Sequence, residues 1–455
     1  MDQGPGPLTN FIALSLRTRI VRSLPLVAIG IGAFLTRYVL IQTVRTECDD
    51  ATYVIGGCYR YGSDAEYVGT QADFLVEGYG FVSPAVHPLG KTPGAAHPPL
   101  HTIFIAGLEL FGLYDVWQWR IATSVVGGIG VLLIGLAATE AAGNRSRAVG
   151  LIAATIAALN PLLWIKDTDL LAESLLIPAI ATVILLCYRF RRSPSIRTAA
   201  FLGMAIGFAW LIRSEQILLL PLLAPLFIRG PAETPLRQRM GFFAVAALVP
   251  VVMMTPWVLY NLGRFNNPVF ISTNSGVTLR MGNCDDVYHG TNIGYYSWGC
   301  LNTTFIRNWD ESDYDRFQQR QAINYIRDNA SHFPFMMLAR AGRLWKLYKP
   351  IDTMNKEAVL EDHGFFAAKT GLVAIYTLSA LAIPGAVLLK RRSRPISPLL
   401  GPVLLSTLTA ALATPVPRYR TAADVAVVIL AAITLHWCAS HLRRLSGALQ
   451  HSMRE

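Results

Sequence analysis

The stretch GFFAVAALVPVVMMTPWVLY, residues 241–260, contains no charged side chain. A helix of this length crosses the roughly 30 Å of hydrocarbon in a bilayer, where backbone groups can bond only to one another. Similar stretches recur along the chain of 455 residues, of which 53% are hydrophobic and 15% charged. Since about 25% of the residues of a soluble protein are charged, the composition predicts an all-α polytopic membrane protein.

We expect ten membrane-spanning helices, each bounded by basic residues or by a turn rich in proline or glycine. Their predicted bounds are 24–41, 118–141, 149–165, 170–188, 198–212, 217–228, 241–260, 366–389, 398–413 and 425–440. Residues 97–112 are also apolar, but this stretch is short for a span and would invert the charge pattern of every later loop. It is expected to form an interfacial helix instead.

Arginine and lysine gather before the first predicted span and after the second, fourth, sixth, eighth and tenth. Because cytoplasmic loops are enriched in these residues, both termini are expected in the cytoplasm of a bacterial cell. Residues 42–117 and 261–365 then lie outside the plasma membrane, within a single domain of residues 1–455. The net charge of +11 is spread over short loops, which argues against nucleic-acid binding.

Cysteines occur in pairs within the two outer segments: Cys48 and Cys58 in the first, Cys284 and Cys300 in the second. Local pairs in an oxidising compartment are typical of disulfides. We therefore predict two disulfide bonds, with free thiols as the alternative. A zinc site is disfavoured because no C-x-x-C pair or neighbouring histidine accompanies these residues.

The first outer segment contains a predicted amphipathic helix that begins with Asp64 and Glu66 and ends at Gly78. An aspartate at this position can cap the helix. It can also serve as a base at the membrane surface, because clustered acids in such places often carry chemistry. The sequence leaves both roles open for Asp64.

A second acidic group lies in KDTDLLAES, residues 166–174. Glu173 follows Asp169 by four residues, so both are expected on one face of a helix. An acid at the edge of the hydrocarbon is costly and usually functional. Asp167 and Asp169 also suit an ordinary structural role at the interface.

Arg213, Arg418 and Arg420 lie on the predicted outer side, against the trend that keeps cations in the cytoplasm. Such exceptions point to a function, for example the binding of an anion. For Arg213 the alternative is a structural ion pair with Glu215 or Asp424.

Five features stand in order along the chain. They are the helix led by Asp64, GYGF at 78–81, HPPL at 97–100, Glu173 at the start of a span, and PRYR at 417–420. This ordered set resembles the GT-C superfamily of membrane glycosyltransferases over most of the chain. It is most similar to the branch of protein O-mannosyltransferases and aminoarabinose transferases (glycosyltransferase family 39-like), and within it to uncharacterised actinobacterial members.

The resemblance implies a GT-C fold and an inverting transfer of sugar from a polyprenyl-phosphate donor to an extracytoplasmic hydroxyl on a lipid, glycan or protein. It makes Asp64 the carboxylate base, with Glu173, Asp169 and Glu66 as further catalytic acids. The family often has two adjacent acids at its first motif. Here Ala65 separates Asp64 from Glu66, so the second acid departs from the pattern.

The same resemblance implies cations that hold the donor phosphate. The candidates are Arg213, Arg418, Arg420 and His97, which stands roughly where aminoarabinose transferases carry a lysine before a proline. Asp-x-Asp spacing would suit a divalent cation, but the resemblance implies no metal, and no cofactor is expected.

A transporter or flippase of polyprenyl-linked lipid or sugar is the competing class. Transporters often show internal repeats and ionisable residues in the middle of their spans. No repeat relates the halves of this chain, and its acids lie at the outer ends of spans. A non-enzymatic assembly protein would keep the helices without the acids, so Asp64 and Glu173 favour an enzyme.

Overall fold

The computed structural model describes residues 7–44, 64–84, 92–143, 146–230, 234–303, 308–361 and 363–452. Within these ranges the chain is helical, with no strand and one isolated bridge between Val82 and Pro93. The helices are α1 Pro7–Val44, α2 Asp64–Val76, α3 Leu100–Leu110, α4 Val116–Ala142, α5 Arg147–Leu159, α6 Pro161–Thr168, α7 Glu173–Arg192, α8 Ile196–Ile212, η1 Ser214–Leu218, α9 Leu219–Ile228, α10 Leu236–Asn261, α11 Ser275–Met281, α12 Asp285–Tyr288, η2 Trp298–Cys300, α13 Glu311–Asp328, α14 Phe333–Leu344, α15 Pro350–Leu360, α16 Gly364–Arg391, α17 Ser397–Leu412, η3 Pro417–Arg420 and α18 Thr421–Ser452.

The chain is an integral membrane protein, as predicted. Among the described residues, six helices are long and apolar enough to span a membrane, namely α1, α4, α7, α10, α16 and α18 with η3. Helices α5 and α6 make a seventh if the bent pair is one span. The shorter apolar helices α8, α9 and α17 coincide with three more predicted spans, so the total of ten stays a prediction.

The predicted span at 149–165 is not one straight helix, because α5 and α6 meet at an angle of 56°. Pro161 lacks the N–H that would continue α5, and its ring suits the first position of a new helix. Asn160 caps that helix by accepting a hydrogen bond from the backbone of Leu162 at 3.1 Å. A local proline and its capping residue therefore change the direction of the chain between α5 and α6.

The expectation that Asp169 and Glu173 share one helical face is wrong. Helix α6 ends at Thr168, Leu170 has a positive φ of 56°, and α7 starts only at Glu173. The predicted span at 170–188 therefore begins three residues too early. The two acids lie on opposite sides of a turn between two helices and pair with different residues.

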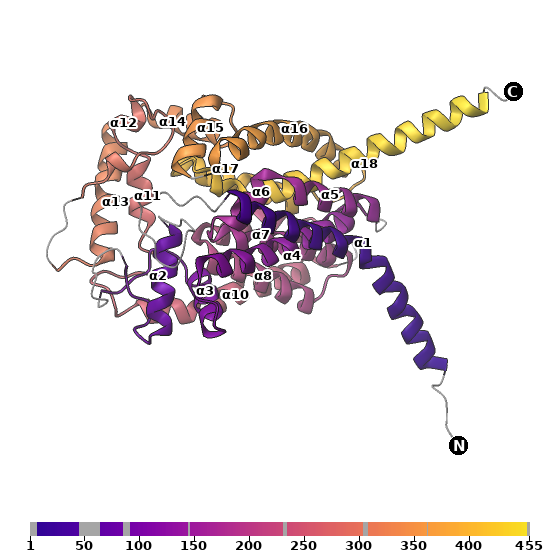
Figure 1. The fold of residues 1–455 in the computed structure, drawn as a ribbon, viewed down its shortest axis with the longest axis horizontal. Coiled ribbons are helices and arrows are strands. Elements are labelled where there is room, and N and C mark those ends of the chain that lie inside the picture. Colours follow the sequence, from indigo (N-terminus) through magenta and orange to yellow (C-terminus); the bar gives the residue numbers. More distant parts are fainter. Residues whose placement is uncertain are drawn as a thin grey trace, which may run out of the picture.

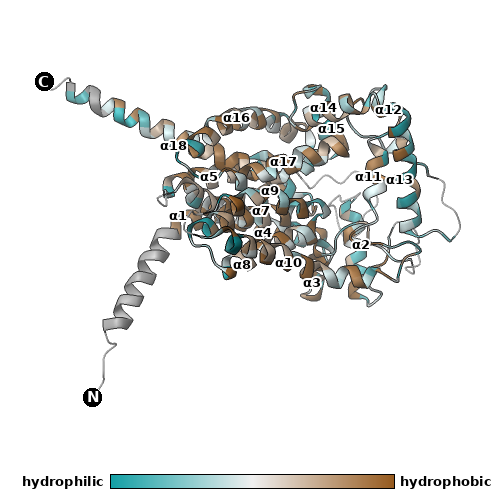
Figure 2. Ribbon diagram, turned by 180° about the vertical axis from the view of Figure 1, so that it is seen from behind, coloured by the Kyte–Doolittle hydropathy of each residue, from teal (hydrophilic) through white to brown (hydrophobic). Residues whose placement is uncertain are grey.

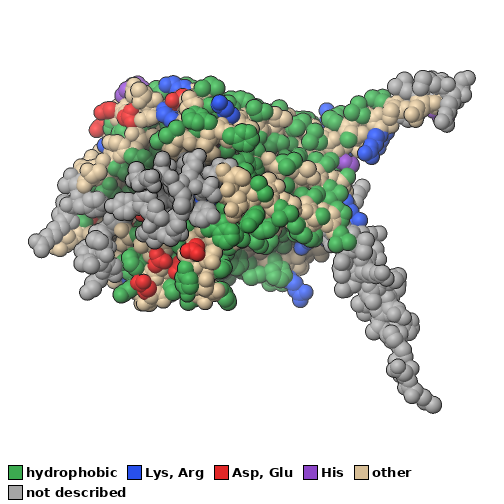
Figure 3. All heavy atoms as spheres, viewed as in Figure 1, with side chains coloured by type: hydrophobic (Ala, Val, Ile, Leu, Met, Phe, Trp, Pro, Cys, Tyr) green, Lys and Arg blue, Asp and Glu red, His purple; other side chains and the backbone are tan. Residues whose placement is uncertain are grey.

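Close helix packing in the bundle relies on small residues, as is usual in membranes. Gly30 of α1 and Gly128 of α4 lie face to face, and a Cβ added at either would come within 3.1 Å of the other's carbonyl oxygen. Figure 2 shows the hydrophobic helices concentrated in the bundle, with hydrophilic residues along α13. Hydrophobic side chains also cover much of the bundle's outer surface in Figure 3.

Helices α2, α11, α12 and α13 gather at one end of the bundle, and the last turns of α18 leave it at the other (Figure 1). The predicted helix led by Asp64 is confirmed as α2, and Gly78 after it has the positive φ of 86° that favours glycine. Helix α3 is short, as predicted for residues 97–112.

An apolar cluster seats α2 against the turn between α6 and α7. Ala65 and Val68 of α2 pack with Ile105 of α3, Trp119 of α4 and Leu170 of the turn. All five side chains are buried. This cluster brings two acids that are distant in sequence, one at the start of α2 and one at the start of α7, to the same end of the bundle.

Candidate active site

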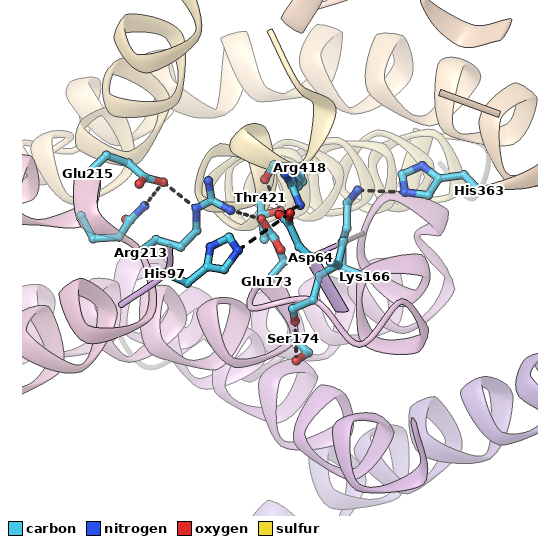
Figure 4. A network of polar contacts seen from close by, with 12 residues as sticks. Asp64, His97, Lys166, Glu173, Ser174, Arg213, Glu215, His363, Arg418 and Thr421 are labelled. Atoms are coloured by element: carbon cyan, nitrogen blue, oxygen red, sulfur yellow. Dashed lines mark hydrogen bonds and ion pairs between the residues drawn. The ribbon is translucent and has the colours of Figure 1, made fainter. Parts of the chain in front are cut away.

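Five predicted residues meet at the end of the bundle that carries α2, and we call them the outer cluster: Asp64, His97, Glu173, Arg213 and Arg418 (Figure 4). An oxygen of Asp64 lies 2.5 Å from Nη1 of Arg418. The other Asp64 oxygen lies 3.8 Å from Nε2 of His97. Glu173 forms an ion pair with Arg213. The cluster therefore combines carboxylates with guanidinium groups from four separate segments of the chain.

Arg213 stands between two carboxylates, because its Nε donates to Glu215 at 2.7 Å while its Nη1 contacts Glu173. Its guanidinium also lies 4.5 Å from the centre of the Tyr419 ring, a cation–π contact. The structural pair with Glu215 that the sequence left open is thus present. The predicted alternative partner, Asp424, instead binds Arg420.

The outer cluster is graded in exposure. Asp64 and His97 are 24% and 22% exposed, whereas Glu173 is 1% exposed. Arg418 and Arg213 are intermediate at 18% and 15%. Asp64 therefore lies on the accessible side of the cluster and Glu173 at its base.

Electrostatics keep Asp64 ionised. Burial alone would raise its pKa, but the charges of Arg418 and His97 and a hydrogen bond from Arg418 lower the pKa to about 2. For His97, burial lowers the pKa, and this effect outweighs the attraction of Asp64. The cluster thus presents an anionic carboxylate beside an imidazole that favours its neutral form.

Glu311, at the start of α13, holds the segments that carry the outer cluster. One of its oxygens accepts a 2.7 Å hydrogen bond from the Tyr67 hydroxyl. The other accepts from the Ala95 backbone at 2.8 Å and from the Thr273 hydroxyl at 2.7 Å. These bonds tie the second outer segment both to α2 and to the loop that carries the cluster's histidine.

Three other predicted site residues lie elsewhere. Glu66 is exposed on α2. Asp169 pairs with His363, whose Nε2 lies 3.1 Å from the carboxylate and 3.2 Å from Nζ of Lys166. Arg420 is 2% exposed and binds Asp424 at 2.9 Å. The structure does not bring these residues into the outer cluster.

Sequence reasoning missed Lys166 and His363, which line a small pocket with Arg420 and Glu357 between α6, α15, α16 and η3. Lys166 could have been noticed because it is a lysine at the end of an apolar run. For His363 there was no such signal, because its partners lie nearly two hundred positions away in the sequence.

Asp167, which the sequence left with an even choice of roles, is fully buried. It binds Nε of Arg37 at 2.6 Å, and the two side chains are 0% and 1% exposed. We call this ion pair between α1 and α6 the buried pair.

The predicted disulfide between Cys284 and Cys300 is confirmed. Cys48 and Cys58 lie outside the described residues. In the described part of the chain no three His, Cys, Asp or Glu side chains are grouped so that they could hold a metal ion.

Comparison with known proteins supports the architecture. The sequence profile of the family described as dolichyl-phosphate-mannose-protein mannosyltransferase matches residues 96–260, a little over a third of the chain. No curated protein matches the chain significantly.

Solved structures are similar at low sequence identity. The oligosaccharyltransferase AglB from Archaeoglobus fulgidus, in complex with an inhibitory peptide and a dolichol-phosphate, matches with a TM-score of 0.54 and 14% identity over 93% of this chain and 52% of that one. Its apo form gives a TM-score of 0.51 at 14% identity, over 94% and 52% of the two chains. ArnT from Cupriavidus metallidurans, bound to undecaprenyl phosphate, gives 0.40 at 16% identity over 90% and 78%. The chain spans about half the length of the archaeal enzyme.

The fold is that of the GT-C membrane glycosyltransferases, so the expected fold class and the resemblance to this superfamily are confirmed. Within that class, residues 96–260 match the mannosyltransferase branch. The narrower placement among actinobacterial members stays a prediction.

Proposed function

We propose that the protein is a glycosyltransferase that moves a sugar from a polyprenyl-phosphate donor to the hydroxyl of an extracytoplasmic lipid, glycan or protein. The observation that carries this proposal is the outer cluster, where an ionised, partly exposed Asp64 adjoins Arg418 and lies in the electrostatic field of Arg213. Similarity of fold to a protein solved with a dolichol-phosphate supports the same class of donor.

In the proposed reaction the acceptor oxygen attacks the anomeric carbon as the bond from that carbon to the phosphate oxygen breaks. Asp64 takes the proton of the acceptor hydroxyl, which is a weak nucleophile by itself. The lipid phosphate leaves with its negative charge stabilised by Arg418 and Arg213. Attack from the face opposite the phosphate inverts the anomeric centre.

Because Asp64 is paired with Arg418, the donor would have to bind before Asp64 can act as a base. While the pair is intact, Asp64 is a weak base because its pKa is about 2. A donor phosphate competes with Asp64 for Arg418, and the pKa of the carboxylate rises as the guanidinium turns to the phosphate. Donor binding would thereby prepare the base for the acceptor.

We place the site on the extracytoplasmic face with both termini in the cytoplasm. Basic loops at the other end of the bundle support this orientation. The Cys284–Cys300 disulfide lies in the same outer segment as Glu311, as expected in an oxidising compartment.

The test is a panel of polyprenyl-phosphate sugars offered to the purified full-length protein in nanodiscs, with products read by mass spectrometry. Asp64→Asn is expected to lower the rate about 10²–10⁴-fold while the melting temperature persists. Glu66→Gln makes the same charge change on the exposed face of α2 and should keep the rate. Full activity in Asp64→Asn would remove this residue from the mechanism, and lipid flux in vesicles without transfer would favour a transporter.

A further inference from the structure

His101 is a buried histidine next to the outer cluster to which neither the sequence nor the proposed reaction gives a role. It lies in the first turn of α3, four residues after His97, and its side chain is 2% exposed. Among the described residues, its Nε2 atom has no hydrogen-bond partner. Buried polar atoms in proteins are rarely left in this condition, and such exceptions often mark binding sites.

The surroundings of His101 place it at the base of the outer cluster. The ring lies in the electrostatic field of the Glu173 and Asp64 carboxylates. Burial, the largest influence, lowers the pKa of His101 to about 4. At neutral pH the ring is therefore uncharged and has one N–H to donate.

Two further atoms of the cluster share this property. Oε2 of Glu173 and Nε of Arg418 are also buried without a hydrogen-bond partner in the described part of the protein. Three such atoms, from α3, α7 and η3, thus lie in one charged region. Two of them, Nε2 of His101 and Nε of Arg418, are nitrogens that can donate a hydrogen bond to an anion.

The start of α3 adds a second kind of donor. Pro99 is its capping position and offers no side-chain hydrogen bond to the first turn. Prolines also precede the helix, so the first N–H groups belong to Leu100, His101 and Thr102. Helix N-termini with free N–H groups favour anions.

We propose that His101 is a donor-binding residue whose Nε2–H, together with the first turn of α3, hydrogen-bonds a phosphate oxygen of the polyprenyl-phosphate donor. This inference rests on the proposed function. The phosphate would then accept a hydrogen bond from an uncharged imidazole as well as from the guanidinium groups of Arg213 and Arg418.

The test measures binding of polyprenyl phosphate, without sugar, to the full-length protein in phosphatidylcholine nanodiscs. His101→Phe keeps a planar ring and removes the donor, and it is expected to weaken binding about tenfold. His101→Gln retains an N–H near the same place and should bind within about threefold of the wild type. The matched control is Ile105→Val, which trims the buried packing of α3 against α2 beyond the first turn and should leave affinity unchanged.

Wild-type affinity in His101→Phe would overturn the inference while leaving the proposed function intact. An equal loss in Ile105→Val would also overturn it, because the effect would then come from the packing of α3. Unchanged carrier binding with a raised KM for the sugar-bearing donor would move the contact from phosphate to sugar and refute the assignment. If the wild type bound no polyprenyl phosphate, both the inference and the proposed function would fail.

Discussion

The buried pair and the outer cluster adjoin the same short turn, between α6 and α7, yet they differ in access to solvent. Asp167, just before the turn, and Arg37 are fully buried. Glu173, just after it, leads into a cluster in which Asp64 is 24% exposed. Breaking a buried pair leaves an uncompensated charge, whereas partly exposed groups can exchange partners with little cost. The same two side-chain types therefore stabilise the fold in one place and remain available to a ligand in the other.

The largest expected effect comes from breaking the buried pair. Asp167→Asn leaves Arg37 without a counter-charge between α1 and α6 and should cost about 3–5 kcal/mol of stability. The measurement is the fraction of protein that survives heating in nanodiscs, read by size-exclusion chromatography.

A double variant provides the control for this prediction. Arg37→Met with Asp167→Leu replaces the pair by apolar groups and should recover most of the lost stability. Wild-type heat resistance in the single variant would contradict the structural role of the pair and erase the contrast with the outer cluster.

The second effect concerns catalysis rather than stability. Glu173→Gln should lower the transfer rate about 100-fold and leave the melting temperature nearly unchanged, because Arg213 keeps Glu215 as a partner at 2.7 Å. Glu215→Gln removes the other carboxylate of the same arginine and should cost less than about fivefold in rate. Equal losses in the two variants would show that only the total charge around Arg213 matters.

A smaller effect is expected from the support of the outer cluster. Tyr67→Phe removes the hydroxyl that binds Glu311 and should lower kcat about tenfold with KM unchanged, because this bond fixes α2, the helix that carries Asp64. Tyr325→Phe is a matched control, because its hydroxyl makes a similar 2.8 Å bond to Asp285 in the same outer segment. A rise in KM with constant kcat in Tyr67→Phe would instead place this side chain in contact with substrate.

The smallest effect is a pH dependence of stability. Burial lowers the pKa of His97 in the folded protein below its ordinary value of 6.5, so the unfolded chain takes up the proton first. The stability linked to neutral His97 is present above pH 6.5 and is lost as the pH falls through its lowered folded pKa. The melting temperature should therefore fall less in His97→Gln than in the wild type between pH 7.5 and 5.5, and identical falls would argue against a buried neutral imidazole.

Much of the fold was predictable because lipid restricts the backbone to helices. Uncharged runs such as 241–260 located the spans, and local cysteine spacing located the Cys284–Cys300 bond. The helix from Asp64 to the glycine after it was readable from its cap and its end. These features depend on neighbours in the sequence.

The break at Asn160 was not predictable in the same way. Pro161 ends α5, but Pro178 lies inside α7, and Pro250 and Pro256 lie inside α10, without ending either helix. A proline in an apolar run is therefore compatible with both outcomes, and tertiary packing decides between them. The prediction that Asp169 and Glu173 share one helical face failed for the same reason, because it assumed one continuous helix.

Part of the candidate site could be predicted, but its pairings could not. Asp64, His97, Glu173, Arg213 and Arg418, chosen from their unusual positions and from the family resemblance, lie together, whereas the predicted Glu66, Asp169 and Arg420 lie elsewhere. Nothing local revealed that Arg418 serves Asp64 or that Asp169 serves His363. His101 could have been noticed only as a second histidine in the short run HPPLH at 97–101, because His97 precedes α3 and no helical spacing links the two.

The buried pair also has a consequence for how the chain is made. Arg37 leaves the ribosome 130 positions ahead of Asp167, a delay of roughly ten seconds at ordinary rates of translation. During that interval the first span carries an arginine without its acid, and the long side chain can reach toward the lipid headgroups. Helix α1 thus inserts before its ion-pair partner has been synthesised, and α6 later supplies that partner, Asp167. Exchanging α1 for an unrelated signal anchor would keep the topology and remove the partner for which Asp167 is buried.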